Sequence, residues 1–310
     1  MKKANLIFSL SFTIIISTNV NSQTIAEKLG YEKNAKLLIV HADDIGLSHS
    51  VNTATIKAFE ESGISSASIM VPCPWFPEIA AYAKKNPQYD FGLHLTLTAE
   101  WKNYRWGGVL SANEIPSLLD KNGFFYASSE EVAANANPKE VEKELIAQIE
   151  RAMAFGIKPT HLDSHMGSLF STPELFHVYL KVGAAYDLPV FLPLNAVKGY
   201  PQLMPLIDEG LIAVDNFFMM ETNRPTNEWT AYYQNIVENL GPGLNEIIIH
   251  LAIDDNEMQA VTIDHPEFGS TWRQNDLNTV LSEEFKSTLK KNNIKLITWK
   301  QIMDLSNSRH

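Results

Sequence analysis

Four short clusters in this sequence place histidines beside carboxylates or at the end of apolar runs. They lie at residues 41–46 (HADDIG), 92–95 (GLHL), 160–165 (THLDSH) and 246–250 (EIIIH). Each coincides with the end of a strand-like run, and parallel α/β folds build their sites at that edge of the sheet. Because none contains cysteine, a metal bound there would be Zn²⁺, Mn²⁺, Mg²⁺ or a related ion, and ligand type alone does not choose among them.

The first cluster carries two adjacent carboxylates, Asp43 and Asp44, directly after the apolar run 36–41. Acidic residues are also common at helix N-termini, so one interpretation is that the pair simply begins the next helix. Neighbouring residues that leave a strand point in different directions. One carboxylate can then bind a metal while the other takes a proton from water, a division of labour that suits a metal-assisted hydrolase.

The histidines of the next two clusters leave the ligand set open. A lone histidine inside an apolar strand, such as His94, is more often a core residue, and only the matching clusters make it a candidate ligand. His161 and His165 are four residues apart, and the strand end and loop predicted there can deliver either or both to a metal. Asp163 lies between them and can orient a ring nitrogen of either one. The alternative is a polar loop that caps the following helix.

The last cluster ends in His250, which can protonate a leaving group. The alternative is a strand-end histidine bonded to backbone. Downstream, Arg273 and Asp276 can support Asp43 or His250 electrostatically, or they can simply begin a surface helix. The sequence contains no phosphate-binding loop, no dinucleotide fingerprint and no serine-hydrolase elbow, which leaves the His and Asp clusters as the best candidates for chemistry.

The elements expected to position these clusters alternate between strands and helices after residue 35. Continuous apolar runs predict strands, and residues with a helical period predict helices. Strands are expected at 36–41, 66–71, 91–96, 160–162, 190–192, 211–214, 247–250 and 296–298. Helices are expected at 50–62, 77–85, 138–155, 173–186, 228–240 and 277–291. This order predicts a single α/β domain at 23–310, a closed or distorted (β/α) barrel first and an open doubly wound sheet second.

The composition restricts the environment and the partners of the protein. A formal net charge of −11 over 310 residues disfavours nucleic acid and anionic membranes as partners. The single cysteine, Cys73, excludes an intramolecular disulfide and a cysteine-based zinc site. Residues 1–22 combine two lysines with a short apolar stretch and predict a signal peptide cleaved before Gln23, so the mature chain is expected in the periplasm or outside the cell, without stable membrane insertion. An uncleaved membrane anchor is the alternative.

The four clusters together resemble the YdjC-like carbohydrate deacetylases, a family that includes the chitooligosaccharide deacetylases. The strings that carry the resemblance are HADDIGLS at 41–48, GLHL at 92–95, PTHLDSH at 159–165 and the late run at 246–250. Their order matches the family, and the resemblance extends from about residue 36 to residue 300. It implies a distorted (β/α) barrel related to polysaccharide deacetylases.

The resemblance also implies a role for each matching residue. Asp44 matches the metal-binding aspartate of the family, and His94 and His165 match its two metal-binding histidines. Asp43 matches the proposed catalytic base. His250 is similar in place to the late histidine that assists protonation of the leaving group. The implied cofactor is one divalent ion, Zn²⁺ or Mg²⁺ in the first place and Mn²⁺ or Co²⁺ as alternatives.

The implied reaction removes acetyl groups from N-acetylated sugars or oligosaccharides. Alternatives are an O-acetyl esterase or another amidohydrolase on the same scaffold, or a sugar-binding protein without turnover. Two departures concern the substrate: Met166 follows His165 where the family often has further histidines, and Leu251 follows His250 where related enzymes often have proline. The sequence does not predict an oligomeric state.

Residues 99–136 interrupt the alternation of elements and predict an aromatic-rich insertion above the sheet. Aromatic rings combine apolar area with a polar edge and can stack on sugar faces. The candidates are Trp101, Tyr104 and Trp106, with Trp272 and Trp75 from outside the insertion. The same rings can instead pack the insertion onto the barrel.

Overall fold

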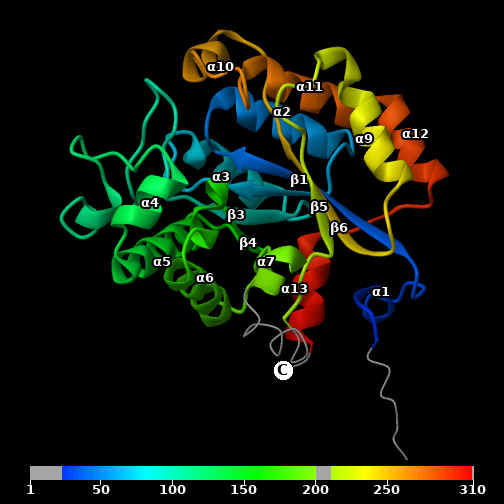
Figure 1. Cartoon of the computed structure of the whole chain (residues 1–310), viewed down its shortest axis with the longest axis horizontal. Helices are drawn as coiled ribbons and strands as arrows, with labels where there is room; N and C mark the ends of the chain where they lie inside the picture. Colours follow the sequence, from blue (N-terminus) through cyan, green and yellow to red (C-terminus); the bar gives the residue numbers. More distant parts are fainter. Residues whose placement is uncertain (1–22, 200–210, 309–310) are drawn as a thin grey trace, which may run out of the picture.

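A parallel sheet forms the centre of the molecule in the computed structural model, which describes residues 23–199 and 211–308 (Figure 1). The strand order is β4-β3-β2-β1-β6-β5, and β7 pairs with the start of β1. The strands are β1 Lys36–Ile45, β2 Ser66–Ile69, β3 Phe91–Leu95, β4 Leu162–Ser164, β5 Asn216–Phe218, β6 Gly243–His250 and β7 Lys295–Leu296. The predicted signal peptide at 1–22 lies outside the described residues.

Single bridges complete the ring between the two edges of this sheet. Leu162 of β4 pairs with Val190, and Pro193 pairs with Val214, just before β5. The expected distorted (β/α) barrel is therefore confirmed, but strands at 190–192 and 211–214 are wrong. Proline lacks the N–H that a ladder needs, and Pro193, with Pro189 on the other side of this segment, keeps the pairing to isolated bridges.

Helices pack around the barrel, with α9, α11 and α12 on one side of the sheet and α5 and α6 on the other (Figure 1). The described α-helices are α1 Ile25–Lys28, α2 His49–Glu60, α3 Phe76–Lys85, α4 Ser129–Asn135, α5 Pro138–Ala154, α6 Pro173–Ala185, α7 Leu194–Gly199, α9 Trp229–Glu238, α10 Asn256–Val261, α11 Ser270–Leu281, α12 Glu283–Lys291 and α13 Trp299–Asn307. Short 3₁₀ helices are η1 Pro116–Leu118, η2 His165–Phe170 and η4 Thr226–Glu228. None of these described helices is long and apolar enough to cross a membrane.

The one helix expected at 277–291 is two helices. Ser282 between α11 and α12 has an extended backbone, and its side chain accepts a hydrogen bond from Phe285 N. Serine is a favoured N-cap residue, so it ends one helical pattern and begins the next. The first of these helices, α11, begins earlier than expected, at Ser270. Its first turn lies at the mouth of the barrel, where Arg273 reaches Asp44.

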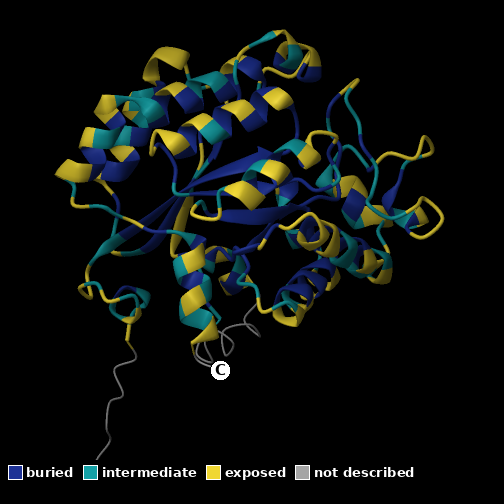
Figure 2. Cartoon of the chain, turned by 180° about the vertical axis from the view of Figure 1, so that it is seen from behind, coloured by how far each residue is buried: buried dark blue, intermediate teal, exposed yellow. Residues whose placement is uncertain are grey.

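The central strands of the sheet are buried, as Figure 2 shows, whereas β5 and β7 are partly exposed. Every residue of β2 and β3 is buried, which is typical of parallel strands covered by helices. At the amino end, β7 pairs with Leu37 and Leu38 of β1, so α13, which follows β7, lies at that end of the barrel. The carboxyl ends of the strands remain for the site.

Candidate metal centre and active site

Asp43 and Asp44 lie at the carboxyl end of β1, where the strand is irregular. The register of β1 with β2 shifts between Ala42 and Ile45, as in a β-bulge, and Asp44 has a φ of 69°. Side chains of a regular strand alternate between its two faces, whereas a bulge re-aims one of them. Both adjacent carboxylates therefore line the same cavity. A left-handed backbone at a non-glycine residue is costly and tends to occur at functional sites.

The rest of the first motif turns the chain into α2. Gly46 has a φ of +99°, and a Cβ there would lie 3.1 Å from the carbonyl oxygen of Met70, so the position requires glycine. The Ser48 side chain accepts a hydrogen bond from Val51 N and caps α2. The two carboxylates thus lie before the helix and do not cap it.

Asp44, His94 and His165 converge at the barrel mouth. Asp44 Oδ1 lies 3.3 Å from His94 Nε2 and 3.2 Å from His165 Nδ1. The candidate ligand atoms of the three residues lie within 4.8 Å of one another. Among the described residues, Asp44 Oδ1 has no hydrogen-bond partner although it is buried. An unpaired buried carboxylate oxygen is costly, and this donor set fits a divalent cation.

Each of these three side chains is held at its other end. Arg273 Nη2 donates to Asp44 Oδ2 at 2.7 Å. Asp163 Oδ1 lies 2.6 Å from His94 Nδ1, and Glu100 Oε2 lies 3.0 Å from His165 Nε2. Outer partners of this kind fix the ring orientation and leave one ligand atom free. No sequence motif surrounds Glu100, and only the fold brings it to His165.

The charges around Asp44 favour its ionised form. Burial acts to raise the pKa of Asp44, but the Arg273 guanidinium and the rings of His165 and His94 hold that pKa well below its ordinary value. Arg273 was expected to support Asp43 or His250. Its direct hydrogen bond, from the first turn of α11, is to Asp44, and its charge also helps to lower the pKa of His250.

Asp43 and His250 face each other across β1 and β6. They are partners in the strand register, and Asp43 Oδ2 lies 3.8 Å from His250 Nε2 and also 3.8 Å from His94 Nε2. Burial lowers the pKa of His250 to about 4, so its ring is neutral at neutral pH. This pair can accept and pass a proton beside the candidate metal site.

Asp276 acts on the backbone of His250 and not on its ring. Its Oδ2 accepts a hydrogen bond from His250 N at 2.9 Å, and its Oδ1 accepts bonds from Trp229 Nε1 and Tyr233 OH. Asp276 was expected to support the His250 ring electrostatically. Its hydrogen bond is instead with the His250 backbone, so it holds the end of β6 in place. Burial raises the pKa of Asp276 to about 6.

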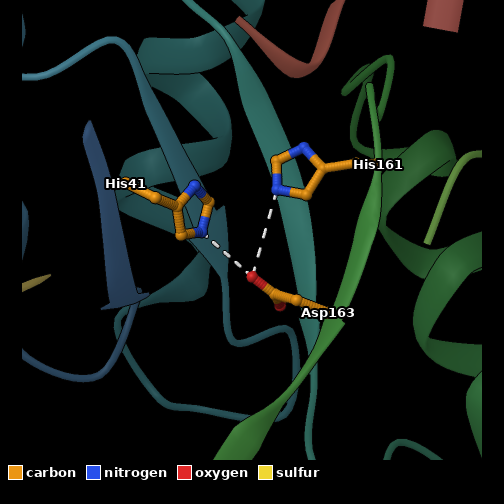
Figure 3. Close-up of side chains that lie close together, drawn as sticks. All are labelled: His41, His161 and Asp163. Atoms are coloured by element: carbon orange, nitrogen blue, oxygen red, sulfur yellow. Dashed lines mark hydrogen bonds and ion pairs between the residues drawn. The ribbon is translucent and has the colours of Figure 1, made fainter. Parts of the chain in front are cut away.

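His161 does not reach the candidate metal centre. His161 precedes β4 and His165 follows it as the first residue of η2, so the two histidines lie at opposite ends of that strand. The His161 ring stacks on Trp299 with ring centroids 5.0 Å apart. Its Nε2 lies 4.0 Å from Asp163 Oδ2 (Figure 3). His165, and not His161, therefore lies beside Asp44 as a candidate ligand.

A cavity of about 980 Å³ lies over this centre. Only Trp101 of the predicted aromatic contacts lines it, and that side chain is 1% exposed. Tyr104, Trp106, Trp272 and Trp75 are not among the residues that line this cavity. The Tyr104 hydroxyl donates to Leu47 O, and Trp272 packs edge-to-face on Trp229 of α9. Sugar contacts of these side chains stay a prediction. Other apolar side chains line the cavity instead: Phe170, Phe191, Phe217, Met219 and Phe268. They are scattered along the chain, and no sequence pattern marks them.

Comparison with known proteins agrees with this arrangement. The profile of the YdjC-like protein family matches residues 37–291. The chain belongs to this family. A carbohydrate deacetylase from Thermus thermophilus is 33% identical over 241 residues, which cover 76% of this chain and 84% of that protein. A chitooligosaccharide deacetylase from Yersinia enterocolitica is 31% identical over 210 residues, 66% of this chain and 72% of that protein.

A solved structure resembles the whole YdjC-like domain. It is the crystal structure of an Enterococcus faecalis protein whose name proposes a role in cellobiose-phosphate cleavage. The two chains are 26% identical with a TM-score of 0.73, over 86% of this chain and 99% of that chain. The barrel described above is therefore the fold of this family.

Proposed function

We propose that this chain is a metal-dependent carbohydrate deacetylase that hydrolyses the acetamido group of an N-acetylated sugar or oligosaccharide. The observation that carries the proposal is the buried Asp44 Oδ1, which has no hydrogen-bond partner in the described part of the chain and lies between the ring nitrogens of His94 and His165, with a second carboxylate, Asp43, beside it. The relatives from Thermus thermophilus and Yersinia enterocolitica, which are named deacetylases, support the same reaction class.

In this proposal Asp44, His94 and His165 hold one divalent ion, with Zn²⁺ or Mg²⁺ as first candidates and Mn²⁺ or Co²⁺ as alternatives. When bound, the ion supplies Lewis acidity to the acetyl carbonyl and lowers the pKa of a water molecule. Arg273, Asp163 and Glu100 keep the three ligands oriented.

Two residues then move protons in the proposed reaction. Asp43 removes a proton from the attacking water as general base. His250 is neutral at neutral pH, so it must first gain the proton that it delivers to the departing amine. The nearest source is Asp43, whose Oδ2 lies 3.8 Å from His250 Nε2. Acetate and a free amino sugar are the products.

The cavity suits the apolar face of a sugar ring. Phe170, Phe191, Phe217 and Phe268 provide aromatic surface around the polar centre, and rings of this kind stack on apolar sugar faces. The acetylated substrate is accordingly proposed to lie between these side chains and the His and Asp cluster.

Acetate release tests this function. The purified chain, supplied in turn with Zn²⁺, Mg²⁺, Mn²⁺ and Co²⁺, is expected to release acetate from N-acetylglucosamine or its β-1,4 disaccharide and to stop after EDTA. Acetate release from O-acetylated sugars alone would replace the proposal with an esterase. Sugar binding without any acetate release would replace it with a binding protein.

We further propose that the mature chain is exported. This rests on residues 1–22 alone, which carry the basic and apolar pattern of a signal peptide. Expression of the full chain in a bacterium, followed by fractionation and N-terminal sequencing, is expected to give a periplasmic or secreted protein that begins at Gln23. An intact N-terminus in the membrane fraction would indicate an uncleaved anchor.

A further inference from the structure

A buried chain of contacts connects the proposed base with a proposed metal ligand, one level below the cavity. Asp43 Oδ1 lies 3.2 Å from His41 Nε2. The same nitrogen lies 3.0 Å from Asp163 Oδ2, and Asp163 Oδ1 lies 2.6 Å from His94 Nδ1. Figure 3 shows the rings of His41 and His161 on either side of the Asp163 carboxylate. Neither the metal ligands nor the proton transfers described above use His41.

We infer that His41 is a positioning residue for Asp43, which it holds by one carboxylate oxygen so that the other faces the cavity. His41 and Asp43 are two residues apart on β1, so their side chains lie on the same face at successive levels. With Oδ1 directed down to His41, Asp43 Oδ2 is the oxygen that lies 3.8 Å from His94 Nε2 and His250 Nε2. This inference rests on the proposed function, because it takes Asp43 as the base.

The surroundings of His41 keep it in place. The ring is 1% exposed, and its Nε2 also lies 3.1 Å from Ser68 Oγ. Burial alone would lower the pKa of His41, but the hydrogen bonds with Asp163 and Asp43 raise it to about 10. A protonated ring between two carboxylates gives charge-assisted contacts, which are the strong kind. His41 therefore ties Asp43 to Asp163, the residue that also orients His94.

A second metal ion is the competing explanation, since candidate ligand atoms of His41, His161 and Asp163 lie within 4.8 Å of one another. A charged His41 ring explains more of the contacts, because it forms a hydrogen bond with Asp163 and an ion pair with Asp43 at once. An ion held by those three residues would leave the approach of His41 Nε2 to Asp43 unexplained, and His161 Nε2 lies 4.0 Å from the shared Asp163 oxygen. Metal stoichiometry separates the two explanations.

The test compares His41→Leu, which removes the ring N–H, with His41→Gln, whose amide can still donate toward Asp43. His161→Leu is the matched control, because it removes an equally buried ring that does not contact Asp43. Metal content, kcat, KM for an N-acetylated sugar and melting temperature are measured for each. His41→Leu is expected to lose about 10–100-fold in kcat, while KM and one metal ion per chain are retained. His41→Gln recovers most of that loss, and His161→Leu keeps kcat within about threefold of wild type.

Several results would overturn the inference. These are an unchanged kcat in His41→Leu, equal losses in the Leu and Gln variants, equal losses in the His41 and His161 variants, or two ions per wild-type chain of which His41→Leu loses one. If His41→Leu does not fold, His41→Asn replaces it, because its shorter amide falls short of Asp43. A wild-type protein that releases no acetate would contradict the proposed function, and the metal content would still report on the second-ion alternative.

Discussion

At the scale of single residues, Asp43 and Asp44 are chemically identical neighbours with different partners. Asp44 receives a hydrogen bond from Arg273 and faces two imidazoles. Asp43 lies between His41 below and His250 across the sheet. The bulge in β1 directs both carboxylates into one cavity. Their proposed roles therefore differ because their contacts differ and not because of their residue type.

Substitution of each aspartate should therefore have a different result. Asp44→Ala is expected to lower metal content at least about tenfold, because it removes the shared ligand between His94 and His165. Asp43→Asn is expected to keep the metal and to lose about 10²–10⁴-fold in kcat, because an amide cannot accept the water proton. Metal analysis and initial rates on the same preparations check both. Normal rates in Asp43→Asn would exclude it as the base.

Glu246 gives a pH-dependent prediction for the metal-free protein. It is 1% exposed, lines the cavity and has one oxygen without a partner among the described residues. Burial raises its pKa from 4.5 to about 8. The stability contributed by the protonated folded form is fully present below pH 4.5 and is lost as the pH rises to about 8, because the unfolded chain ionises first.

The substitution Glu246→Gln removes this ionisation. One pKa unit corresponds to about 1.4 kcal/mol. The unfolding free energy of the variant minus that of wild type should therefore be roughly 3–5 kcal/mol larger at pH 9 than at pH 4. Urea unfolding in EDTA across this pH range measures the difference. Glu238→Gln on the exposed surface of α9 is the control, because it removes a carboxylate that does not line the cavity. A parallel pH dependence in wild type and Glu246→Gln would show that Glu246 is not the group responsible.

At the scale of elements, the pairing of β3 with β4 brings His94 and Asp163 to the same level, and His165 follows just beyond the end of β4. β3 and β4 pair in register, with His94 opposite Asp163 and Leu95 opposite Ser164. Below this level the ring of His161 lies over Gly92, where a built Cβ would come within 2.3–2.5 Å of its atoms. The glycine in the GLHL string therefore makes room for a histidine in the next strand.

Gly92→Ala should accordingly destabilise the protein. The His161 ring is buried and stacked on Trp299, so it cannot move away freely, and overpacking of this kind costs about 1–3 kcal/mol. The unfolding free energy in urea measures the loss. Gly241→Ala is the control, because no atom lies within 4 Å of a Cβ built there, and it should change stability by less than about 0.5 kcal/mol. Equal effects of the two substitutions would contradict the packing argument.

At the scale of the whole molecule, the site joins parts of the chain that are far apart. Asp44, His94 and His165 come from β1, β3 and the start of η2 directly after β4, and Arg273 comes from α11 near the C-terminus. An ion bound to the first three residues links elements of the folded barrel and has no equivalent site in the unfolded chain. Metal binding should therefore stabilise the entire domain.

Thermal unfolding with and without metal measures this coupling. A ligand at 100 times its Kd adds about 2.7 kcal/mol to the stability of the folded state. At about 2–4 °C per kcal/mol for a domain of this size, Tm should rise by about 5–10 °C. Asp44→Ala should show no such rise. A metal-dependent Tm that persists in Asp44→Ala would place the stabilising ion elsewhere.

The sequence by itself determined the class of fold and the candidate ligands. Continuous apolar runs and helical periods are local properties, so they predicted the alternating strands and helices, and short motifs indicated Asp43, Asp44, His94, His165 and His250. Strand edges were less predictable. The segments at 190–192 and 211–214 have strand-like composition, yet only single bridges form there, because Pro189 and Pro193 on either side of the first segment limit the pairing.

Only the tertiary structure decided which side chains meet. It placed His161 and His165 at opposite ends of β4, and it brought Glu100 and Arg273 to the candidate ligands from distant positions. It placed phenylalanines rather than most of the predicted tryptophans around the cavity. The physical reason is that residue spacing specifies a periodic face within one element, whereas contacts between elements depend on register, bulges and crossover paths that arise only when the barrel closes.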